Sequence, residues 1–309
     1  MKTVSIIVPV YNEEDNILHF TEAVSEVMNK EPYEWDLLFI DDGSKDSSLD
    51  IIEKLQIEHD NIHVLALSRN YGHQIALTCG LDHATGDAVI SMDGDMQHPP
   101  ALLPELLRKW EEGFEIVQTI RKDTEGVSML KKKTSELYYK IINRLSTIRV
   151  RPGGSDFRLL DRKAVDALGE YREHDRFLRG MVTLLGFREA DVEFVAPPRF
   201  AGKSKFSVSK MMKLAVDGIV GYSVVPLRFT FVAGMLFALL SFCLLVHALF
   251  VYFCYETVSG WTTIIVFMSI FAGIQLIILG IIGEYLGRIY TEVKNRPLYQ
   301  LKNTKIRKN

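Results

Sequence analysis

Two aspartates separated by a single glycine form the clearest chemical signal in this 309-residue sequence. Asp93 and Asp95 come directly after a short apolar run, at the point where a strand would end. Two carboxylates placed in this way can present hard oxygen ligands to Mg²⁺ or Mn²⁺, and such a cation can bridge the phosphates of a nucleotide. The structural alternative is an Asp-Gly hairpin turn. Because a helical pattern follows rather than a partner strand, we favour a metal site.

A second acidic cluster, Asp41-Asp42-Gly43-Ser44, follows another apolar run. Ser44 and Asp46 suit the N-cap of the next helix and Gly43 suits a turn, so the cluster has a purely structural interpretation. Ligand binding is compatible with capping, because Asp42 can reach a ribose hydroxyl or a base edge while its neighbours cap the helix. Both interpretations stay open.

The elements that must position these residues form a regular alternation. Apolar, β-branched runs predict five strands, at residues 4–10, 37–40, 62–67, 88–92 and 116–120. Helical patterns lie between them, at residues 13–29, 47–58, 73–84 and 100–112. Strands separated by helices indicate βαβ units and a mainly parallel sheet, in which ligands bind at the carboxyl ends of the strands. We therefore predict an α/β fold with its site at that edge.

Two common phosphate-binding patterns are absent from the sequence. No GxGxxG motif follows the first predicted strand, which disfavours a dinucleotide-dependent oxidoreductase. The tripeptide Gly202-Lys203-Ser204 resembles the end of a P-loop but lacks the upstream glycine at the required spacing. The nucleotide, if one binds, must be held in another way.

The charged residues are unevenly distributed. The formal net charge is only −3, which gives no sign of a polyanionic partner such as nucleic acid. Residues 1–228 carry 29 basic and 36 acidic side chains, residues 229–287 carry no lysine or arginine, and residues 288–309 carry seven basic side chains and one acidic. The chain thus has an acidic part, an apolar part and a basic tail.

The apolar part contains two segments of membrane-spanning length, residues 229–255 and 261–287. A buried helical hairpin of a soluble protein is the alternative, but 59 consecutive residues without lysine or arginine favour membrane spans. Basic residues flank the pair and the connection between the segments has none, so the positive-inside rule puts both termini and the acidic part in the cytoplasm. We predict a multi-pass protein of the inner, or cytoplasmic, membrane.

These observations predict four regions along the chain. They are a soluble domain at residues 1–206, an interfacial amphipathic helix and linker at 207–228, two transmembrane helices at 229–287 and a basic cytoplasmic tail at 288–309. The apolar side chains of the second region fall on one helical face, as in helices that lie on a membrane surface. Residues 131–149 show a similar pattern, and for them an interfacial helix and a helix packed on the sheet both stay open.

The motifs, taken in order, resemble those of the glycosyltransferase family 2 catalytic domain, which has a GT-A fold. They are most similar to its polyprenyl-phosphate branch, which includes bactoprenol glucosyltransferases and dolichol-phosphate mannose synthases. The resemblance covers nearly the whole chain, and the joint occurrence of the motifs is specific although each motif alone is not. It runs through the paired apolar segments and through SIIVPVYNEE (5–14), DDGSKD (41–46), LSRNYG (67–72), DGDMQHPP (93–100), SDFRL (155–159) and RFAGKSKF (199–206).

The resemblance implies inverting transfer of a single hexose from a nucleotide-sugar to a lipid phosphate at the cytoplasmic leaflet, giving a polyprenyl-phosphate sugar for cell-envelope glycosylation. It favours UDP-glucose and undecaprenyl phosphate, with UDP-N-acetylglucosamine and GDP-mannose as alternative donors. Members of this branch can associate through the membrane-proximal region and cooperate with a small flippase-like protein. A homo-oligomer such as a tetramer and a partner of that kind are therefore also implied.

Position by position, the resemblance assigns roles to individual residues. The implied nucleotide-binding residues are Pro9, Tyr11, Glu13, Asp42, Arg69, Asp93 and Gly94. The implied ligands of the Mg²⁺ or Mn²⁺ cofactor are Asp93, Asp95 and Gln97, and Gly94 takes a place that alanine often holds. The residues implied to bind phosphate oxygens or the lipid acceptor are Arg121, Arg199, Lys203 and Lys205.

Asp156 occupies the place where enzymes of this family often carry a general base. A phosphate monoester has a second pKa near 6, so a lipid phosphate is already an anionic nucleophile at neutral pH and a strong base is unnecessary. We therefore expect Asp156 to be catalytic in the sense of orienting the acceptor or the sugar. Asp93 and Asp95 are the other implied catalytic residues, as part of the metal and diphosphate site. The structural alternative is a turn residue after Pro152-Gly153-Gly154.

Two other functions fit the sequence less well. A processive polysaccharide synthase usually carries a Gln-x-x-Arg-Trp pattern, which is absent from this sequence, and more membrane spans. A non-catalytic membrane scaffold would have no need of the aspartates and the glutamine singled out above. The sequence therefore favours an enzyme that transfers one sugar.

Overall fold

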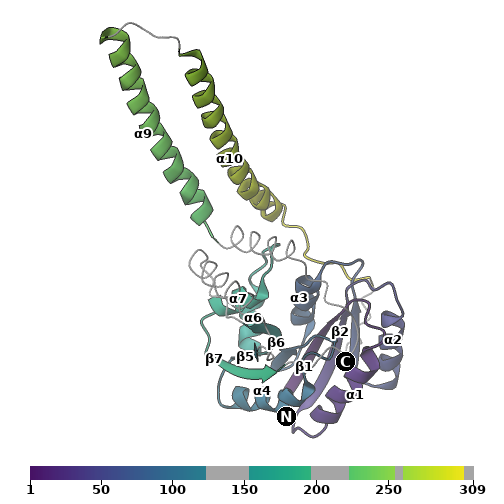
Figure 1. The fold of residues 1–309 in the computed structure, drawn as a ribbon. Helices are drawn as coiled ribbons and strands as arrows, with labels where there is room; N and C mark the ends of the chain where they lie inside the picture. Colours follow the sequence, from purple (N-terminus) through teal and green to yellow (C-terminus); the bar gives the residue numbers. More distant parts are fainter. Residues whose placement is uncertain (123–152, 196–222, 255–259, 303–309) are drawn as a thin grey trace. The chain divides into compact units, whose positions relative to one another are not determined.

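The computed structural model describes residues 1–122, 153–195, 223–254 and 260–302. The first half of the chain alternates strands and helices, as the sequence predicts (Figure 1). Its elements are β1 (Thr3–Val10), α1 (Ile17–Met28), β2 (Glu34–Asp41), α2 (Ser48–Glu58), β3 (Ile62–Ala66), α3 (His73–His83), β4 (Ala88–Ser91), the 3-10 helix η1 (Pro100–Leu102), α4 (Leu103–Glu111) and β5 (Ile116–Lys122). All the expected strands and helices of this half are present.

The largest difference lies at α1, which begins at Ile17 rather than at residue 13. The residues before it form a turn in which Asn12 has a φ of 56° and the Asn16 N–H donates to the Glu13 carbonyl at 2.9 Å. Residues 13–16 therefore form a separate turn closed by this bond from residue i+3 to residue i, and the helix starts only after it, with Asn16 as its N-cap.

The second half of the sheet domain was not expected from the sequence. It contains β6 (Gly154–Asp161), α6 (Arg162–Gly169), α7 (Leu178–Leu184) and β7 (Glu189–Val195). The sheet has the order β3-β2-β1-β4-β6-β5-β7. Strands β1 to β4 pair in parallel, as do β5 and β7, whereas β6 is antiparallel to both of its neighbours. The sheet is therefore mixed but mainly parallel, and the expected α/β class is confirmed.

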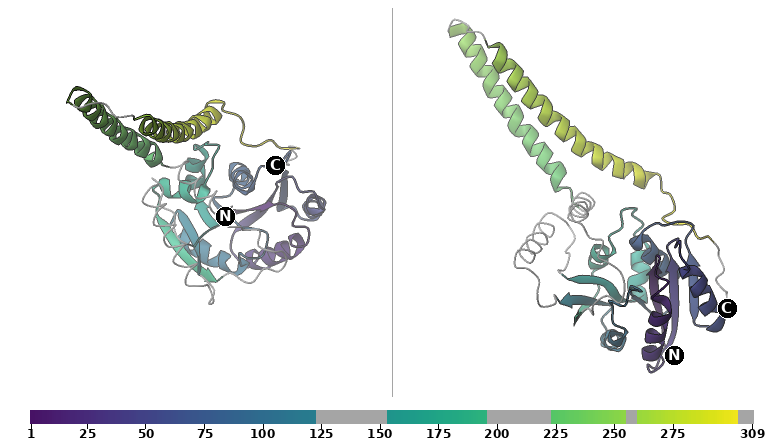
Figure 2. Two further views of the ribbon diagram at one scale, coloured as in Figure 1. Left: turned by 45° about the horizontal axis from the view of Figure 1, so that its top comes forward. Right: turned by 45° about the vertical axis from the view of Figure 1, so that its right-hand side comes forward.

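Helices cover both faces of this sheet (Figure 2). One face of β1 packs into a core with α1, which includes Ile6 and Phe20. On the other face α3 approaches so closely that a side chain at Gly80 would lie 2.8 Å from Ile40 and 3.1 Å from Ile7. Burial on both faces explains why these strands read as continuous apolar runs in the sequence.

The carboxyl ends of the parallel strands meet at one edge of the sheet. In β1 and β2 the register places Val10 opposite Asp41, so that Tyr11 and Asp42 follow the two strands at the same level. Strand β4 runs parallel to β1 with Ser91 opposite Ile7, and it leads into the segment that carries Asp93. The edge where the sequence predicts a site is therefore formed.

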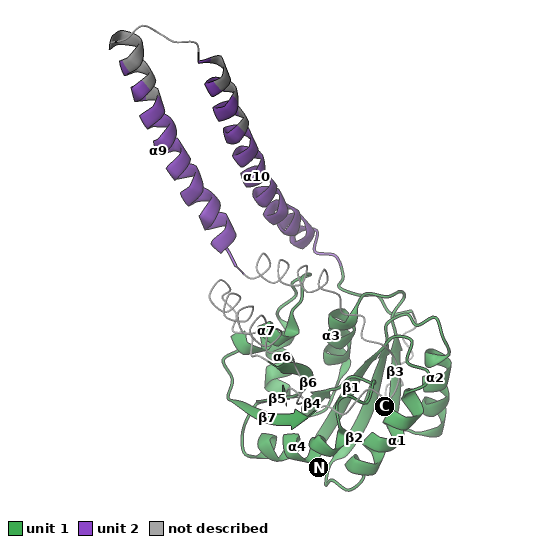
Figure 3. Cartoon of the chain, in the orientation of Figure 1, with its two compact units in different colours: residues 1–143, 148–208, 297–309 green, residues 144–147, 209–296 purple. Residues whose placement is uncertain are grey.

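The described residues divide into two compact units (Figure 3). The first holds residues 1–122, 153–195 and 297–302, and the second holds residues 223–254 and 260–296. The second unit consists of α9 (Val225–Cys254) and α10 (Trp261–Val293). Both helices are long and apolar enough to cross a membrane, judged by length and composition, with mean hydropathies of 2.0 and 2.4 over the candidate spans.

These helices differ from the predicted spans mainly in their ends. Helix α9 begins at Val225, before residue 229, and α10 continues to Val293, beyond residue 287. Their aromatic side chains meet edge to face, with the ring centroids of Phe237 and Phe271 5.9 Å apart. Most of the predicted interfacial segment 207–228, and all of segment 131–149, lie outside the described residues.

Residues 297–302 of the predicted basic tail are packed in the first unit, whereas the start of that tail, residues 288–293, continues α10 in the second unit. Leu301 lies opposite Leu67 in an antiparallel bridge, at the end of the edge strand β3. The charge pattern of residues 288–309 predicts only a tail at the membrane surface and gives no sign of this pairing.

Candidate functional site

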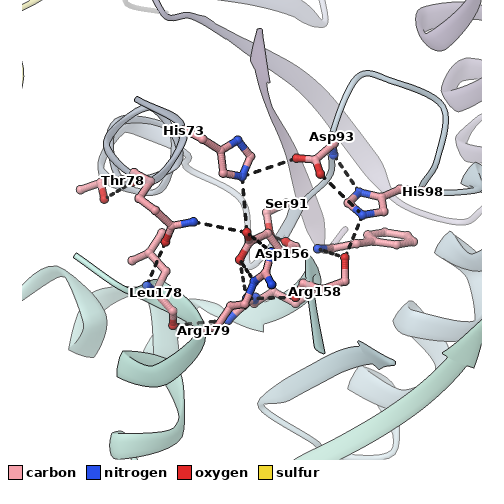
Figure 4. A network of polar contacts seen from close by, with 12 residues as sticks. His73, Thr78, Ser91, Asp93, His98, Asp156, Arg158, Leu178 and Arg179 are labelled. Carbon is pink, nitrogen blue, oxygen red and sulfur yellow. Dashed lines mark hydrogen bonds and ion pairs between the residues drawn. The ribbon is translucent and has the colours of Figure 1, made fainter. Parts of the chain in front are cut away.

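A buried histidine supports the segment that carries the two acidic residues of the DGD motif. The backbone N–H of Asp93 donates to His98 Nδ1 at 2.9 Å (Figure 4). His98 Nε2 must then carry the ring hydrogen, which it can donate to Ser155 Oγ at 2.8 Å. The imidazole stacks on Phe157 with 5.1 Å between ring centroids, and burial lowers its pKa. His98 therefore links the β4 segment to β6 as a neutral imidazole.

The next residues turn sharply after Asp93. Met96 has a φ of 60°, and the Gln97 N–H donates to Asp95 Oδ1 at 3.1 Å. The side-chain oxygen of Gln97 accepts a hydrogen bond from Arg121 Nη1, at the end of β5, at 3.4 Å. A side chain added at Gly94 would lie 3.5 Å from its nearest neighbour, which is an ordinary contact. An alanine side chain would therefore fit at this position.

Three carboxylates gather at this edge of the sheet, and we call Glu13, Asp93 and Asp95 the acidic edge. Burial raises the pKa of Glu13, although a hydrogen bond from Asn16 lowers it. The negative charges of Asp95, Asp46 and Asp93 raise this pKa again. The charges of Asp93 and Asp95 thus repel that of the Glu13 carboxylate, a repulsion that a bound cation would relieve.

The donor set of the acidic edge suits a divalent cation. Within the described residues no three histidine, cysteine, aspartate or glutamate side chains converge as a preformed metal cage. Mg²⁺ is usually held by only one or two carboxylates together with substrate phosphates, so two carboxylates are a sufficient protein contribution. The side chain of Asp93 is 36% exposed and can therefore accept a ligand from solution. Asp93 and Asp95, with the Gln97 amide oxygen beside them, would hold the ion.

Asp156 has different surroundings. It lies inside β6 rather than in a turn, and its side chain is only 4% exposed. Arg158 Nη2 donates to its Oδ1 at 2.9 Å, and Arg179 donates to Oδ1 at 3.0 Å and to Oδ2 at 2.8 Å. Gln74 Nε2 lies 3.3 Å and His73 Nε2 3.4 Å from Oδ2 (Figure 4). The turn alternative is therefore wrong.

These contacts determine the charge of Asp156. Burial alone would raise its pKa, but the hydrogen bond from His73 and the charges of Arg179 and Arg158 hold the pKa well below its usual range. A carboxylate this weakly basic cannot accept a proton efficiently at neutral pH. Its chemical capacity is to orient the side chains around it.

His73 connects Asp156 to the acidic edge. Its Nε2 lies 3.4 Å from Asp156 Oδ2 and 3.6 Å from Asp93 Oδ1. Burial lowers its pKa, but the hydrogen bond to Asp156 and the charge of Asp93 raise it overall. His73 is the first residue of α3, so this helix positions a side chain between two of the predicted aspartates.

Asp42 is buried and holds a neighbouring loop. Its carboxylate accepts hydrogen bonds from the Tyr71 N–H at 2.6 Å and the Gly72 N–H at 2.8 Å, and the residue is 3% exposed. Gly43 permits the approach of this loop, because a side chain there would lie 2.7 Å from the backbone of Arg69. The role of Asp42 in contacting a nucleoside stays a prediction, and the structure adds a second role in fixing the loop.

The other predicted nucleotide residues lie around the same edge. Pro9 stands near the end of β1, and Tyr11, just after it, is 41% exposed. Arg69 is exposed and its guanidinium lies 4.0 Å from the ring centroid of Tyr71. The predicted lipid-facing residues Arg199, Lys203 and Lys205 lie outside the described residues.

The family described as glycosyl transferase family 2 matches residues 5–169 of this chain, a span that contains the acidic edge and Asp156. The chain belongs to glycosyl transferase family 2. It is 41% identical over 296 residues to the uncharacterized glycosyltransferase YkcC of Bacillus subtilis (strain 168), covering 96% of this chain and 92% of that relative. It is 39% identical over 305 residues to the SfII prophage-derived bactoprenol glucosyl transferase of Shigella flexneri, covering 97% of this chain and 98% of that relative.

Among solved structures, this family 2 chain is similar to glucosyl-3-phosphoglycerate synthase from Mycobacterium tuberculosis in complex with Mn²⁺, uridine diphosphate and phosphoglyceric acid. The TM-score is 0.47 and the identity 17%, over 71% of this chain and 76% of that one. Membership of family 2 and the glycosyltransferase relatives establish that the chain is a glycosyltransferase.

Several residues of this family 2 site were not singled out from the sequence. They are His73, Gln74, His98, Arg158 and Arg179. His98 and Arg158 lie inside motifs that were recognised, so their positions were visible but their partners were not. Arg179 comes from α7, an element that was not expected. No local signal marks it, because its contact with Asp156 exists only in the folded chain.

Proposed function

We propose that this chain transfers a single hexose from UDP-glucose to undecaprenyl phosphate, giving a polyprenyl-phosphate sugar that serves cell-envelope glycosylation. The observation that carries this proposal is the 39% identity to a bactoprenol glucosyl transferase along nearly the full length of both chains. That alignment includes the acidic edge and the two apolar helices, which are the parts that a sugar donor and a lipid acceptor require.

The chemistry is a single displacement. An oxygen of the lipid phosphate forms a bond to the anomeric carbon of the sugar while the bond from that carbon to the diphosphate oxygen breaks, with inversion of configuration. The nucleophile is already ionised at neutral pH, so no proton has to be removed from it. The leaving group takes the electron pair and departs as the nucleoside diphosphate.

Different residues of the site bind the cation, bind the nucleotide and position neighbouring side chains. Asp93, Asp95 and Gln97 hold the Mg²⁺ or Mn²⁺ cofactor, which supplies charge stabilisation to the diphosphate leaving group. The nucleotide is bound by Pro9, Tyr11, Glu13, Asp42 and Arg69. Asp156 keeps Arg179 and His73 in place beside the acidic edge, which supports an orienting role for Asp156 rather than that of a base.

Four cations are proposed to meet the phosphates: Arg121, Arg199, Lys203 and Lys205. Arg121 supports this assignment by its place, because it is exposed at the end of β5 and donates to Gln97. An anionic acceptor held at a membrane surface requires cationic groups of this kind.

Two observations support an inner-membrane protein whose catalytic domain lies in the cytoplasm. Residues 297–302 belong to the same compact unit as residues 1–122, although both apolar helices lie between them in the chain. Two segments packed in one unit lie on one side of a membrane, so the chain between them crosses it an even number of times. The basic residues that flank the apolar segments then favour the cytoplasmic side.

The proposal is tested with the full-length protein reconstituted in vesicles that contain undecaprenyl phosphate. Separate reactions receive UDP-glucose, UDP-N-acetylglucosamine or GDP-mannose with Mg²⁺ or Mn²⁺, and the glycolipid is identified by mass. We expect one hexose added to the lipid phosphate from UDP-glucose. A product from another donor alone would replace the proposed donor, and a polymer or no glycolipid with any donor would overturn the proposed reaction.

A further inference from the structure

The segment that follows α10 pairs with the sheet through its backbone. Leu301 lies opposite Leu67 in an antiparallel bridge. The Ser68 N–H donates to the Gln300 carbonyl at 2.8 Å, and the Lys302 N–H donates to the Ala66 carbonyl at 2.7 Å. Both distances are those of ordinary backbone hydrogen bonds. We call residues 298–302 the C-terminal clasp.

A tyrosine extends the clasp to the last turn of α3. The Tyr299 hydroxyl donates to Asp82 Oδ2 at 2.9 Å, and its ring centroid lies 6.1 Å from that of His83. Arg172 binds the same carboxylate through Nη1, at 2.8 and 3.0 Å from its two oxygens. Asp82 is thus a junction between α3, the segment after α6 and the clasp.

The clasp contacts the chain at two points, and residues of the site lie between these points in the sequence. The β3–α3 loop, residues 67–72, begins at the bridge, and its far end is held by the carboxylate of Asp42. Helix α3 follows at once, with His73 and Gln74 at its start beside Asp156 and Asp82 near its end. The clasp therefore contacts the beginning of the loop and the end of the helix, and the site residues lie between these contacts.

We propose that the C-terminal clasp is a positioning segment of the donor site: by holding Ser68 and Asp82 it sets the conformation of the β3–α3 loop and thereby the affinity for the nucleotide-sugar. This inference rests on the proposed function, because it takes the donor to be a nucleotide-sugar bound beside Asp42 and Arg69. It gives the end of the chain, beyond the membrane helices, a part in catalysis.

The clasp contributes few of the interactions that fold the unit. Within the described residues its polar contacts are two backbone hydrogen bonds and the contacts of the Tyr299 hydroxyl with Asp82 and, at 3.5 Å, with His83 Nδ1, whereas the core is made by the sheet and its helices. Its loss should therefore leave the unit folded while the loop becomes less restrained.

The backbone pairing is tested by comparing Lys302→Pro with Lys302→Ala in the full-length protein. Proline removes the N–H that donates to Ala66, whereas alanine removes the same side chain and keeps this donor. Hydrogen exchange measured on peptides that cover residues 66–72 reports on the loop directly. We expect exchange to rise about fivefold in Lys302→Pro, the factor that corresponds to one ordinary hydrogen bond, and to stay at the wild-type rate in Lys302→Ala.

The side-chain contact is tested with Tyr299→Phe, which removes only the hydroxyl that donates to Asp82. Its matched control is Tyr290→Phe, since Tyr290 is 61% exposed on α10 in the other unit. We expect the KM for the nucleotide-sugar to rise about fivefold in Tyr299→Phe, with a smaller change in kcat and an unchanged KM for the lipid acceptor. The control should match the wild type.

The exchange measurement separates the two proposals, because it needs no turnover. If the wild type makes no glycolipid but the Lys302→Pro loop exchanges faster, the proposed function fails and the clasp still restrains the loop. If the wild type turns over and both Lys302→Pro and Tyr299→Phe keep the wild-type KM for the donor, the clasp has no part in positioning the site and the inference is overturned. Equal losses for donor and acceptor would also overturn it.

Discussion

Asp93 and Asp156 are both acidic, both predicted to be functional and both in contact with His73, yet their surroundings are opposite. The side chain of Asp93 is 36% exposed, and its negative charge helps to raise the pKa of the neighbouring Glu13. The side chain of Asp156 is 4% exposed and accepts hydrogen bonds from two arginines and a glutamine. Asp93 can therefore accept a cation from solution, whereas Asp156 is already paired with Arg158 and Arg179.

The difference in burial and pairing indicates separate roles for Asp93 and Asp156. A buried charge is stable only when it is paired and hydrogen-bonded, and removing one partner leaves the other uncompensated. We therefore propose that Asp156 maintains the fold of the site, whereas the acidic edge binds the ligand. Substitutions should separate these two effects, with activity lost at the edge and stability lost in the network.

The largest effect is expected for Asp95→Ala. Removing a carboxylate from the acidic edge removes a ligand of the proposed cation, so kcat should fall by about 10³-fold while the melting temperature stays near that of the wild type. Turnover is measured as glycolipid formed, and unfolding by circular dichroism. Retention of metal-dependent turnover in Asp95→Ala would show that the cation is held elsewhere.

Asp156→Asn should mainly change stability. The substitution leaves Arg158, which is 3% exposed, and Arg179 without their carboxylate, and breaking a buried ion pair costs about 3–5 kcal/mol. Denaturant unfolding of the purified protein measures this loss. The double variant Asp156→Asn with Arg158→Met should recover part of it, because the buried guanidinium is removed as well. A wild-type midpoint in the single variant would contradict the proposed network.

Acid should reveal the same network. The pKa of Asp156 is depressed in the folded protein, so its contribution to stability is present above the unfolded value of about 3.9 and is lost as the pH falls through the lower folded value. The wild type should therefore lose stability more steeply than Asp156→Asn below about pH 4. Unfolding midpoints measured between pH 7 and pH 3 test this difference, and parallel curves for the two proteins would contradict it.

His98→Gln should have an intermediate effect on activity. His98 accepts the Asp93 N–H and links it to Ser155, so its loss leaves the DGD segment less well placed and should lower kcat by about tenfold. The Asp93 N–H can be satisfied again by an asparagine oxygen, so His98→Asn should retain more activity than His98→Gln. Equal losses in the two variants would indicate that this hydrogen bond is unimportant.

The smallest effect is expected for Gly94→Ala. The added side chain would have only an ordinary 3.5 Å contact with Val8, and Gly94 does not have a positive φ. Metal affinity and turnover should stay within about twofold of the wild type, because surface and contact changes of this kind are usually worth less than 0.5 kcal/mol. A large loss of metal affinity or turnover would show that a bound ligand must approach the backbone at Gly94 too closely for a side chain there.

The sequence predicts the two parts of the site unequally well. Strands β1 to β5 were recognisable because burial on both faces makes them continuous apolar runs. Strand β6 was missed because Ser155, Asp156 and Arg158 interrupt its apolar pattern. Asp156 and Arg158 are buried as an ion pair within the strand, and Arg179 of α7 also binds Asp156. Asp93 and Asp95 of the acidic edge are close in sequence and were singled out, whereas the network around Asp156 also needs residues from distant elements, such as Arg179 and His73, which were not.

The C-terminal clasp illustrates the same limit. The residues that pair, Leu67 and Leu301, are separated by most of the chain, including both apolar helices, and nothing in the pattern around Leu301 indicates a strand. Charge alone predicted a tail at the membrane surface. The pairing arises from the open edge of β3, which only the folded sheet provides.

The most direct test is Mn²⁺ binding in the presence of UDP, measured by electron paramagnetic resonance on the full-length wild type, Asp95→Asn and Asp156→Asn. Asp156→Asn is measured under conditions where circular dichroism shows it to be folded. We expect the wild type and Asp156→Asn to bind Mn²⁺ with similar affinity, and Asp95→Asn to lose at least tenfold, about 1.4 kcal/mol. Unchanged binding by Asp95→Asn would contradict the assignment of the cation to the acidic edge.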